Sequence, residues 1–297
     1  MLNLKRILWA TDGSRHSNNA LSFVKLFAKR FNAEIYGLHV IRPVDRKIRD
    51  IVSRRLDVDR MIKEESSIWS NKFESMKRDF AIENLNFSEA IIEKGIPYEE
   101  IISVSTRYKI DLIIMGKRGI GLKERGTIGS NTFKVLQGSR IPVLAVKDRV
   151  TKELPVIKKI LVPFDINEKV NNSFNYAISL GNLLGAGLKV IYVEKLVAYP
   201  YEFPVSVLND IRSFYERELK SRTNEVLAKE NNRISIKHEI LESISPFLGI
   251  IRFAERDKSD LIVMNTHGRK GLRKVILGSV AERVINESPC SVLAIKP

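Results

Sequence analysis

Apolar residues along this chain form short runs that alternate with longer stretches of helical spacing. The first run, residues 6–10, is followed by Ala20, Val24 and Phe27, which recur at the interval of an amphipathic helix. The same alternation continues to the end of the chain. Strands are predicted in the first half at residues 6–10, 34–41, 87–93, 111–115 and 142–147, and in the second half at residues 159–163, 188–194, 234–241, 261–264 and 290–295.

Helical patterns fill the intervals between these strands. Two are long and charged, at residues 50–84 and 205–231, and the first is expected to break near Asp57. Pro97 suits the start of a helix over residues 98–108, since proline is favoured at the first helical position. Strands separated by helices imply right-handed parallel crossovers, so each half predicts an α/β fold with a doubly wound sheet.

The two halves of the chain repeat one another. Residues Asp111–Lys147 align without a gap onto Asp260–Lys296, and DLIIMGKRG in the first segment answers to DLIVMNTHG in the second. A repeat this long indicates a duplicated domain, since solenoid units run to about 20–50 residues. We therefore expect two domains, residues 1–148 and 156–297, joined by a charged linker in which Pro155 prevents helix formation.

A glycine motif follows the fourth predicted strand of the first half. Gly116 and Gly119 are three apart, and after nine further residues Gly129 and Ser130 open the next helical pattern. Closely spaced glycines let the backbone turn with its N–H groups on one side, as a phosphate cradle requires. A Gly-Ser pair at a helix start adds N–H groups, a hydroxyl and the positive end of the helix dipole. The motif predicts a nucleotide phosphate site.

The composition limits what the chain binds. Lys and Arg outnumber Asp and Glu by 50 to 35, a net charge of +15 that suits polyanions. Acidic residues are interleaved with the basic ones around residues 45–60, and no aromatic stacking platform accompanies the charge. A solvated surface is therefore expected rather than a nucleic-acid interface. No apolar run approaches the roughly 18 residues of a membrane span. Cys290, the single cysteine, lies in an apolar strand, and a buried thiol in a cytoplasmic protein is expected.

The motifs of several common enzyme classes are missing from the sequence. It contains no G-x-x-x-x-G-K-[ST], no G-x-S-x-G and no C-x-x-C. The four histidines have no metal-ligand spacing, so no protein-held metal is expected. Mg²⁺ would be bound through nucleotide phosphates, with Asp12, Ser130 and Glu124 as the side chains able to help. Efficient catalysis is not expected, and slow, incidental hydrolysis stays open.

The strand that ends at Asp12 and the pattern G-x-x-G-x9-G-S-N after the fourth strand together resemble the universal stress protein family, in tandem over essentially the whole chain. The resemblance implies two flavodoxin-like, Rossmann-like domains, each a five-stranded parallel sheet of order 3-2-1-4-5 flanked by helices. It also implies ATP bound across the carboxyl ends of the strands, where such sheets bind ligands.

Carried over to this sequence, the resemblance places the adenine and ribose beside Asp12 and Val40, and the phosphates on the glycine motif. The loop cations Lys123 and Arg125 would add charge. Asp12 could instead cap the following helix, a role for which Ser14 is equally suited, and we expect Asp12 to face the ribose. The implied site residues are Ala10, Thr11, Asp12, Val40, Met115, Gly116, Lys117, Arg118, Gly119, Gly129, Ser130 and Asn131.

The second half departs from this pattern where the first glycine should stand. Asn265 occupies that position and begins the segment N-T-H-G. Asparagine tolerates a left-handed backbone, but its side chain would crowd a phosphate, so weaker binding is expected. His267 is expected to form hydrogen bonds within the loop rather than to act as an acid or base. The implied residues of this degenerate site are Asp165, Val193, Gly268, Gly278, Ser279 and Val280.

The function that the resemblance implies is nucleotide-responsive regulation in the stress response. ATP is the expected ligand, and ADP, AMP and cyclic nucleotides stay open. The two domains are expected to pack as an internal pseudo-dimer through residues 143–146 and 292–295, and two chains to associate as a homodimer. A protein partner is also expected, and its identity stays open. A nucleotide-free scaffold and a weak ATPase are the alternatives.

Overall fold

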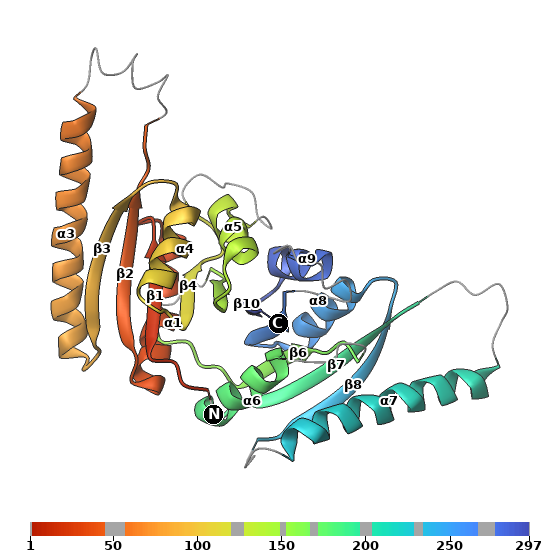
Figure 1. Ribbon diagram of the computed structural model, residues 1–297. Coiled ribbons are helices and arrows are strands. Elements are labelled where there is room, and N and C mark those ends of the chain that lie inside the picture. The colour runs from red at the N-terminus through yellow and green to blue at the C-terminus, as the bar shows by residue number, and fades with distance from the viewer. Residues whose placement is uncertain are drawn as a thin grey trace. The chain divides into compact units, whose positions relative to one another are not determined.

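The computed structural model describes residues 2–44, 57–119, 128–148, 153–166, 172–196, 204–228, 234–266 and 277–296. This part of the chain divides into two compact units, one within residues Asn3–Pro155 and the other from Val156 onward (Figure 1). In the described residues no helix is long and apolar enough to cross a membrane.

The first unit is a parallel sheet flanked by helices. Its elements are β1 (Arg6–Thr11), α1 (Arg15–Phe31), β2 (Glu34–Ile41), α3 (Val58–Ile82), β3 (Phe87–Lys94), α4 (Pro97–Arg107), β4 (Leu112–Gly116), α5 (Ser130–Gly138) and β5 (Val143–Val146). The strands lie in the order β3-β2-β1-β4-β5, and each neighbouring pair is parallel. This confirms the α/β fold and the strand order predicted for the first half.

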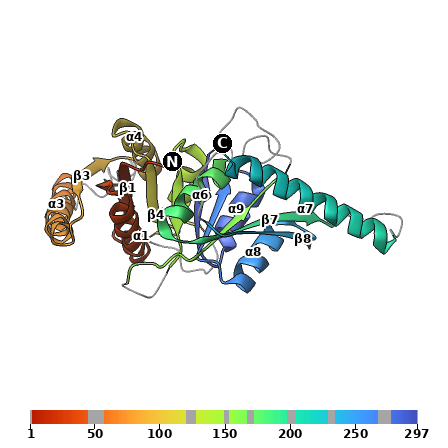
Figure 2. The same cartoon turned by 90° about the horizontal axis from the view of Figure 1, so that it is seen from below.

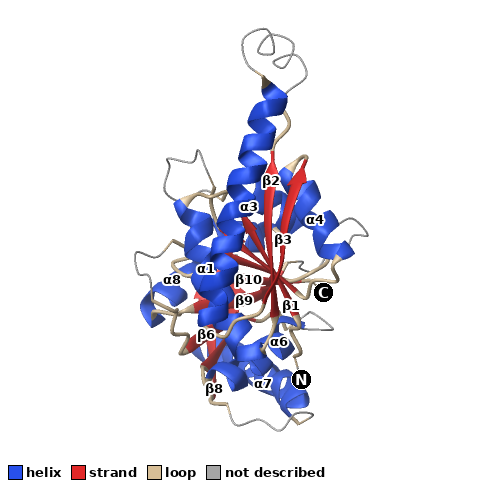
Figure 3. Ribbon diagram, turned by 90° about the vertical axis from the view of Figure 1, so that its left-hand side faces the viewer, coloured by secondary structure: helices blue, strands red, loops and turns tan. Residues whose placement is uncertain are grey.

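The second unit repeats the architecture. Its elements are β6 (Lys159–Pro163), α6 (Asn172–Leu184), β7 (Gly187–Lys195), α7 (Val205–Leu227), β8 (Ile236–Ser243), α8 (Pro246–Asp257), β9 (Leu261–Asn265), α9 (Ser279–Glu287) and β10 (Ser291–Ile295). Its strands lie in the order β8-β7-β6-β9-β10, again all parallel. Figure 3 shows the strands and helices of both units by class.

Helices cover both faces of the first sheet, which explains why β4 and most of β1 are apolar. Trp9 donates its indole N–H to the Ser17 carbonyl of α1 at 3.0 Å, and Phe73 of α3 packs against Gly37, the paired neighbour of Trp9. α1 and α3 therefore share one face. α4 lies on the face opposite α1 (Figure 2). Every residue of β4 is buried, as two covered faces require.

The bounds of α3 and β8 differ from the prediction. α3 begins at Val58 because Asp57 caps it, accepting from the Arg60 N–H at 2.9 Å, so the expected break near Asp57 is a helix start. Residues 50–56 of the predicted helix lie outside the described residues. In the second unit, β8 covers residues Ile236–Ser243, two residues later at each end than predicted.

An aspartate ahead of each fourth strand fixes the start of the first strand in both units. Asp111 Oδ2 accepts from the N–H groups of Lys5 and Arg6 at 2.8 and 2.9 Å. Asp260 Oδ2 accepts from those of Lys158 and Lys159 at 2.9 and 3.0 Å. The repeated DLI segment thus holds the amino ends of neighbouring strands together in each domain.

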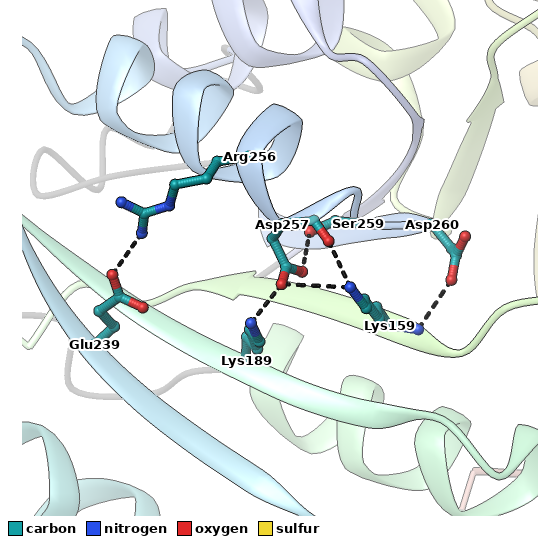
Figure 4. Close-up of polar contacts among 7 residues, drawn as sticks. All are labelled: Lys159, Lys189, Glu239, Arg256, Asp257, Ser259 and Asp260. Carbon is teal, nitrogen blue, oxygen red and sulfur yellow. Dashed lines mark hydrogen bonds and ion pairs between the residues drawn. The ribbon is translucent and has the colours of Figure 1, made fainter.

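In the second unit one aspartate, Asp257, lies between two lysines and a serine near this amino-terminal edge (Figure 4). Asp257, the last residue of α8, is 9% exposed and accepts from Lys189 and, at 2.9 Å, from the Ser259 hydroxyl. The Lys159 ammonium lies 3.7 Å from the same carboxylate. Burial by itself raises the pKa of Asp257, but the hydrogen bonds from Lys189 and Ser259 and the two lysine charges outweigh it. The pKa of Asp257 is therefore lower than that of an ordinary aspartate.

We predict that Asp257→Asn lowers the free energy of unfolding by about 2 kcal/mol at neutral pH. This is less than the roughly 3–5 kcal/mol of a fully buried pair, because Lys159 and Lys189 are partly exposed. A depressed pKa in the folded state stabilises above the ordinary aspartate pKa, and this stabilisation is lost as the pH falls through the folded value. Urea denaturation across pH 2–7 measures both effects. The stabilisation by Asp257 should begin to fall as the pH drops to about 4.

The matched control is Glu239→Gln, because Glu239 pairs with Arg256 on the surface of the same edge (Figure 4). Its cost should stay below about 0.5 kcal/mol. An acid dependence that is the same in Asp257→Asn as in the unsubstituted protein would contradict the assignment.

Candidate functional site

The register of the first sheet brings the predicted base and phosphate residues to one edge. Ala10 of β1 is paired with Met115 of β4, and Thr11 of β1 is paired with His39 of β2, so Val40 follows at the same level. All these strands are parallel, and their carboxyl ends therefore meet at that edge. This is where doubly wound sheets bind ligands.

Gly116 ends β4 where the backbone passes against the start of α1. A Cβ on Gly116 would lie 2.7 Å from both the carbonyl carbon and the carbonyl oxygen of His16. Such a distance cannot be accommodated without moving backbone, so the position requires glycine. A Cβ on Gly119 would lie 2.6 Å from Asp12 Oδ2, which means that the loop after β4 runs directly past the Asp12 carboxylate.

The Asp12 turn is organised by its own side chains. Ser14 caps α1, with its hydroxyl accepting from the Ser17 N–H at 3.1 Å, and Asp12 Oδ1 accepts from the Ser14 N–H at 3.0 Å. Ser14 therefore has the capping role that the sequence left open between it and Asp12. The second oxygen of Asp12 is the one that lies near Gly119.

The glycine motif closes on itself before α5 begins. The Lys117 N–H donates to the Val146 carbonyl at 2.8 Å, and the Gly129 N–H donates to the Lys117 carbonyl at 2.9 Å. These two amides are thus engaged in holding the loop. The Thr132 hydroxyl donates to the Gly116 carbonyl at 2.9 Å, which ties the first turn of α5 to the end of β4.

The start of α5 presents amide groups to this edge. The first intrahelical bond of α5 runs from the Phe133 N–H to the Gly129 carbonyl, so the N–H groups of Ser130 and Asn131 lie ahead of it. Within the described residues no side chain caps this helix end. Amides at a helix start, together with the helix dipole, favour an anion.

The cations of the motif differ in their exposure to solvent. Lys117 is 6% exposed and is therefore largely removed from solvent. Arg118 is half-buried beside it. Lys123, Glu124 and Arg125 lie outside the described residues.

In the second unit the loop is closed by the same backbone hydrogen bonds, but Asn265 stands in place of Gly116. The Thr266 N–H donates to the Ile295 carbonyl at 2.9 Å, and the Gly278 N–H donates to the Thr266 carbonyl at 2.7 Å, as at the equivalent positions of the first unit. Asn265 stands at the glycine position, and its Oδ1 accepts from the Ser173 N–H of α6 at 3.0 Å. The side chain is therefore part of the framework of this edge.

The remaining predicted residues of the second site are only partly brought together. Gly278 precedes α9, and Ser279 and Val280 form its first turn, where no side chain caps the helix among the described residues. Val193 lies in β7 and contacts α8, since a Cβ on Gly249 would meet its side chain at 2.7 Å. Asp165 follows β6. Gly268 and His267 lie outside the described residues.

The comparisons with known proteins agree with this architecture. A sequence model described as Universal stress protein family matches residues 3–147 and again residues 157–296. The chain belongs to the universal stress protein family. The first match contains the complete glycine motif, and the second contains the degenerate copy.

Individual relatives cover one domain or the whole chain. The universal stress protein MJ0531 of Methanocaldococcus jannaschii is 35% identical over 147 residues, which is 47% of this chain and 82% of the relative. The universal stress protein Slr1230 of Synechocystis is 21% identical over 99% of this chain and 100% of its own length. A universal stress protein crystal structure from Archaeoglobus fulgidus matches with a TM-score of 0.71 at 24% identity, covering 98% of both chains, and shows the fold.

Sequence reasoning missed a buried cluster behind the Asp12 turn. His39 is 5% exposed and stacks on Trp69 of α3, with ring centroids 4.0 Å apart. The spacing of the histidines gave no metal-site pattern, and the sequence analysis assigned His39 no other role. The alternation of β2 was the available signal, since it turns His39 and Gly37 to the α3 face and Val40 to the other.

We predict that Gly116→Ala lowers the free energy of unfolding by about 2–3 kcal/mol, because the new methyl group meets the backbone of His16. The matched control is Gly129→Ala in the same motif, where the nearest atom to a new Cβ is 3.4 Å away, and its cost should stay below about 1 kcal/mol. Chemical denaturation compares the two variants. Equal costs would contradict the close approach at the end of β4.

Proposed function

We propose that the first domain, residues 1–148, binds ATP, and that the protein acts as a nucleotide-responsive regulator in the stress response. The observation that carries this proposal is the uncapped start of α5 among the described residues, beside the loop that passes Asp12. A helix start that favours anions and a carboxylate beside the same loop suit the two ends of a nucleotide.

The phosphates would lie on the N–H groups of Ser130 and Asn131 and on the Ser130 hydroxyl. Helix-start amides bind phosphate through direct donation and through the dipole. Lys117, buried at the same loop, would supply positive charge in a poorly solvated place, where it counts for more than on the surface. Gly116, Gly119 and Gly129 would let the backbone approach the phosphates, and Arg118 would add charge.

The ribose and base would lie at the ends of β1 and β2. Asp12 accepts hydrogen bonds from the ribose hydroxyls, since a carboxylate has only acceptors to offer. Ala10, Thr11 and Met115 form the floor at the paired ends of β1 and β4, and Val40 provides main-chain and apolar contact to the adenine. ADP and AMP share these groups and differ only in the phosphates held by α5.

The second domain, residues 156–297, would bind nucleotide more weakly. The Asn265 carboxamide occupies the position where the first domain has no side chain, and its bond to the Ser173 N–H holds it there. Asp165, Val193, Gly268, Gly278, Ser279 and Val280 are the residues that would form the weaker site.

Catalysis is proposed to be slow or absent. In the described residues no cluster of three or more His, Cys, Asp or Glu side chains is placed to hold a metal ion. Mg²⁺ would be bound through the phosphates, with Asp12 and Ser130 nearby. Phosphoryl transfer depends on a positioned metal and nucleophile, so binding rather than turnover is the expected activity.

We further propose assembly through the last strand of each sheet. β5 and β10 each pair on one side within their own sheet, with β4 and β9, and parallel end strands of this kind suit an internal pseudo-dimer and a homodimer of chains. A protein partner would read the nucleotide-bound state. We place this activity in the cytoplasm, in keeping with the single, buried Cys290.

We predict that Asp12→Ala weakens ATP binding by about 10- to 100-fold and Ser130→Ala by about fivefold, measured by isothermal titration calorimetry. The first change removes hydrogen bonds to a charged group, and the second removes one neutral hydroxyl. The matched control is Ser279→Ala, the same substitution at the start of α9, which should leave the main binding event unchanged.

Circular dichroism should show all three variants folded. Absence of ATP binding by the unsubstituted protein would overturn the proposed function and leave a nucleotide-free scaffold. Faster turnover of ATP than its release would instead favour an ATPase.

A further inference from the structure

A buried polar and aromatic cluster joins α3 to the turn that carries Asp12. His39 of β2 lies with Nδ1 3.0 Å from the Thr11 carbonyl oxygen and Nε2 3.1 Å from Glu65 Oε1 of α3. Its ring is stacked on Trp69 of α3, with an interplanar angle of 15°. His39 and Trp69 are 5% and 7% exposed. Figure 3 shows α3 in front of the strands of the first unit.

Both ring nitrogens of His39 face oxygen acceptors. A carbonyl and a carboxylate accept hydrogen bonds, so a neutral ring donates to one of them, and the imidazolium form donates to both and bridges β1 and α3. The contact is therefore directional. An apolar residue could fill the same space between β2 and α3, but it could not form these two hydrogen bonds.

The cluster touches the chain on both sides of Asp12. His39 contacts the carbonyl of Thr11, the residue before it. Trp69 contacts Gly13, the residue after it: a Cβ on Gly13 would lie 3.0 Å from Cζ2 of Trp69. Gly13 has a φ of +78°, a conformation that other residues adopt only with strain. The turn is thus held by α3 at both flanks of the carboxylate.

The second unit carries a different residue at the matching strand position. Tyr192 is the counterpart of His39, because Ile191 is paired with Pro163 as Leu38 is with Ala10. Tyr192 packs against Tyr215 of α7 with ring centroids 5.0 Å apart, so the aromatic contact between strand and long helix is kept. The hydrogen-bonded bridge to the first strand is found in the unit whose glycine motif is complete.

We propose that His39 and Trp69 are positioning residues, which set the Asp12 turn for the nucleotide and transmit its occupancy to α3. This inference rests on the proposed function. When ATP engages Asp12, the turn shifts against Trp69 and the Thr11 carbonyl shifts against His39. α3, which contributes Glu65 and Trp69 to the cluster, takes up this change.

The test uses the full chain and its two tryptophans, Trp9 and Trp69. Trp9→Phe leaves Trp69 as the single indole reporter. We expect its emission to change on ATP titration, saturating with the midpoint found by calorimetry. If Trp9→Phe does not fold, the difference between the spectra of the unsubstituted protein and Trp69→Phe isolates the same signal.

Affinity supplies the second readout. His39→Leu removes the donor to the Thr11 carbonyl and should weaken ATP binding about tenfold. His39→Asn places an amide N–H near the position of Nδ1 and should recover most of that loss, which a simple packing role would not predict. Tyr192→Phe, at the matching strand position of the second unit, should leave the main binding event unchanged.

The outcomes separate this inference from the proposed function. Normal ATP binding with a flat Trp69 emission, or with His39→Leu binding as tightly as the unsubstituted protein, overturns the inference and leaves the proposed function standing. An unsubstituted protein that binds no ATP overturns both.

Discussion

The close passage of the chain at the end of β4 is the constraint on which the proposed site depends. There the backbone of Gly116 runs against the first turn of α1, with no room for a Cβ beside the His16 carbonyl. This approach lets the loop continue past Asp12 and return at Gly129, where α5 begins. The end of β1, the glycine loop and the start of α5, which no described side chain caps, thereby meet at one edge of the parallel sheet.

The two units show how one framework gives two different edges. Both close the loop with the same pair of backbone bonds, and both fix the opposite edge with an aspartate in the DLI segment. They differ at the end of the fourth strand, where the Asn265 side chain holds α6 and Gly116 has no side chain against the backbone of His16. Duplication thus preserved the fold, while the two copies carry different residues at this strand end.

Most of the fold could be predicted, because buried parallel strands are continuous apolar runs and Pro97 and Ser14 mark helix starts. The glycine motif could also be located, because it lies between an apolar strand and a helical pattern in the sequence. The burial of Lys117, the hydrogen bond of Asn265 to α6 and the stack of His39 on Trp69 could not, because each depends on residues distant in sequence. Local patterns carry no information about which helix face meets which strand.

The most direct test of this account is mass spectrometry of the nucleotide released from protein purified without added nucleotide, with its molar ratio to the chain. The proposed binding in the first domain and weaker binding in the second predict about one ATP per chain. A ratio near two would contradict the role given to Asn265. Protein that carries no nucleotide and binds none when ATP is added would contradict the central claim.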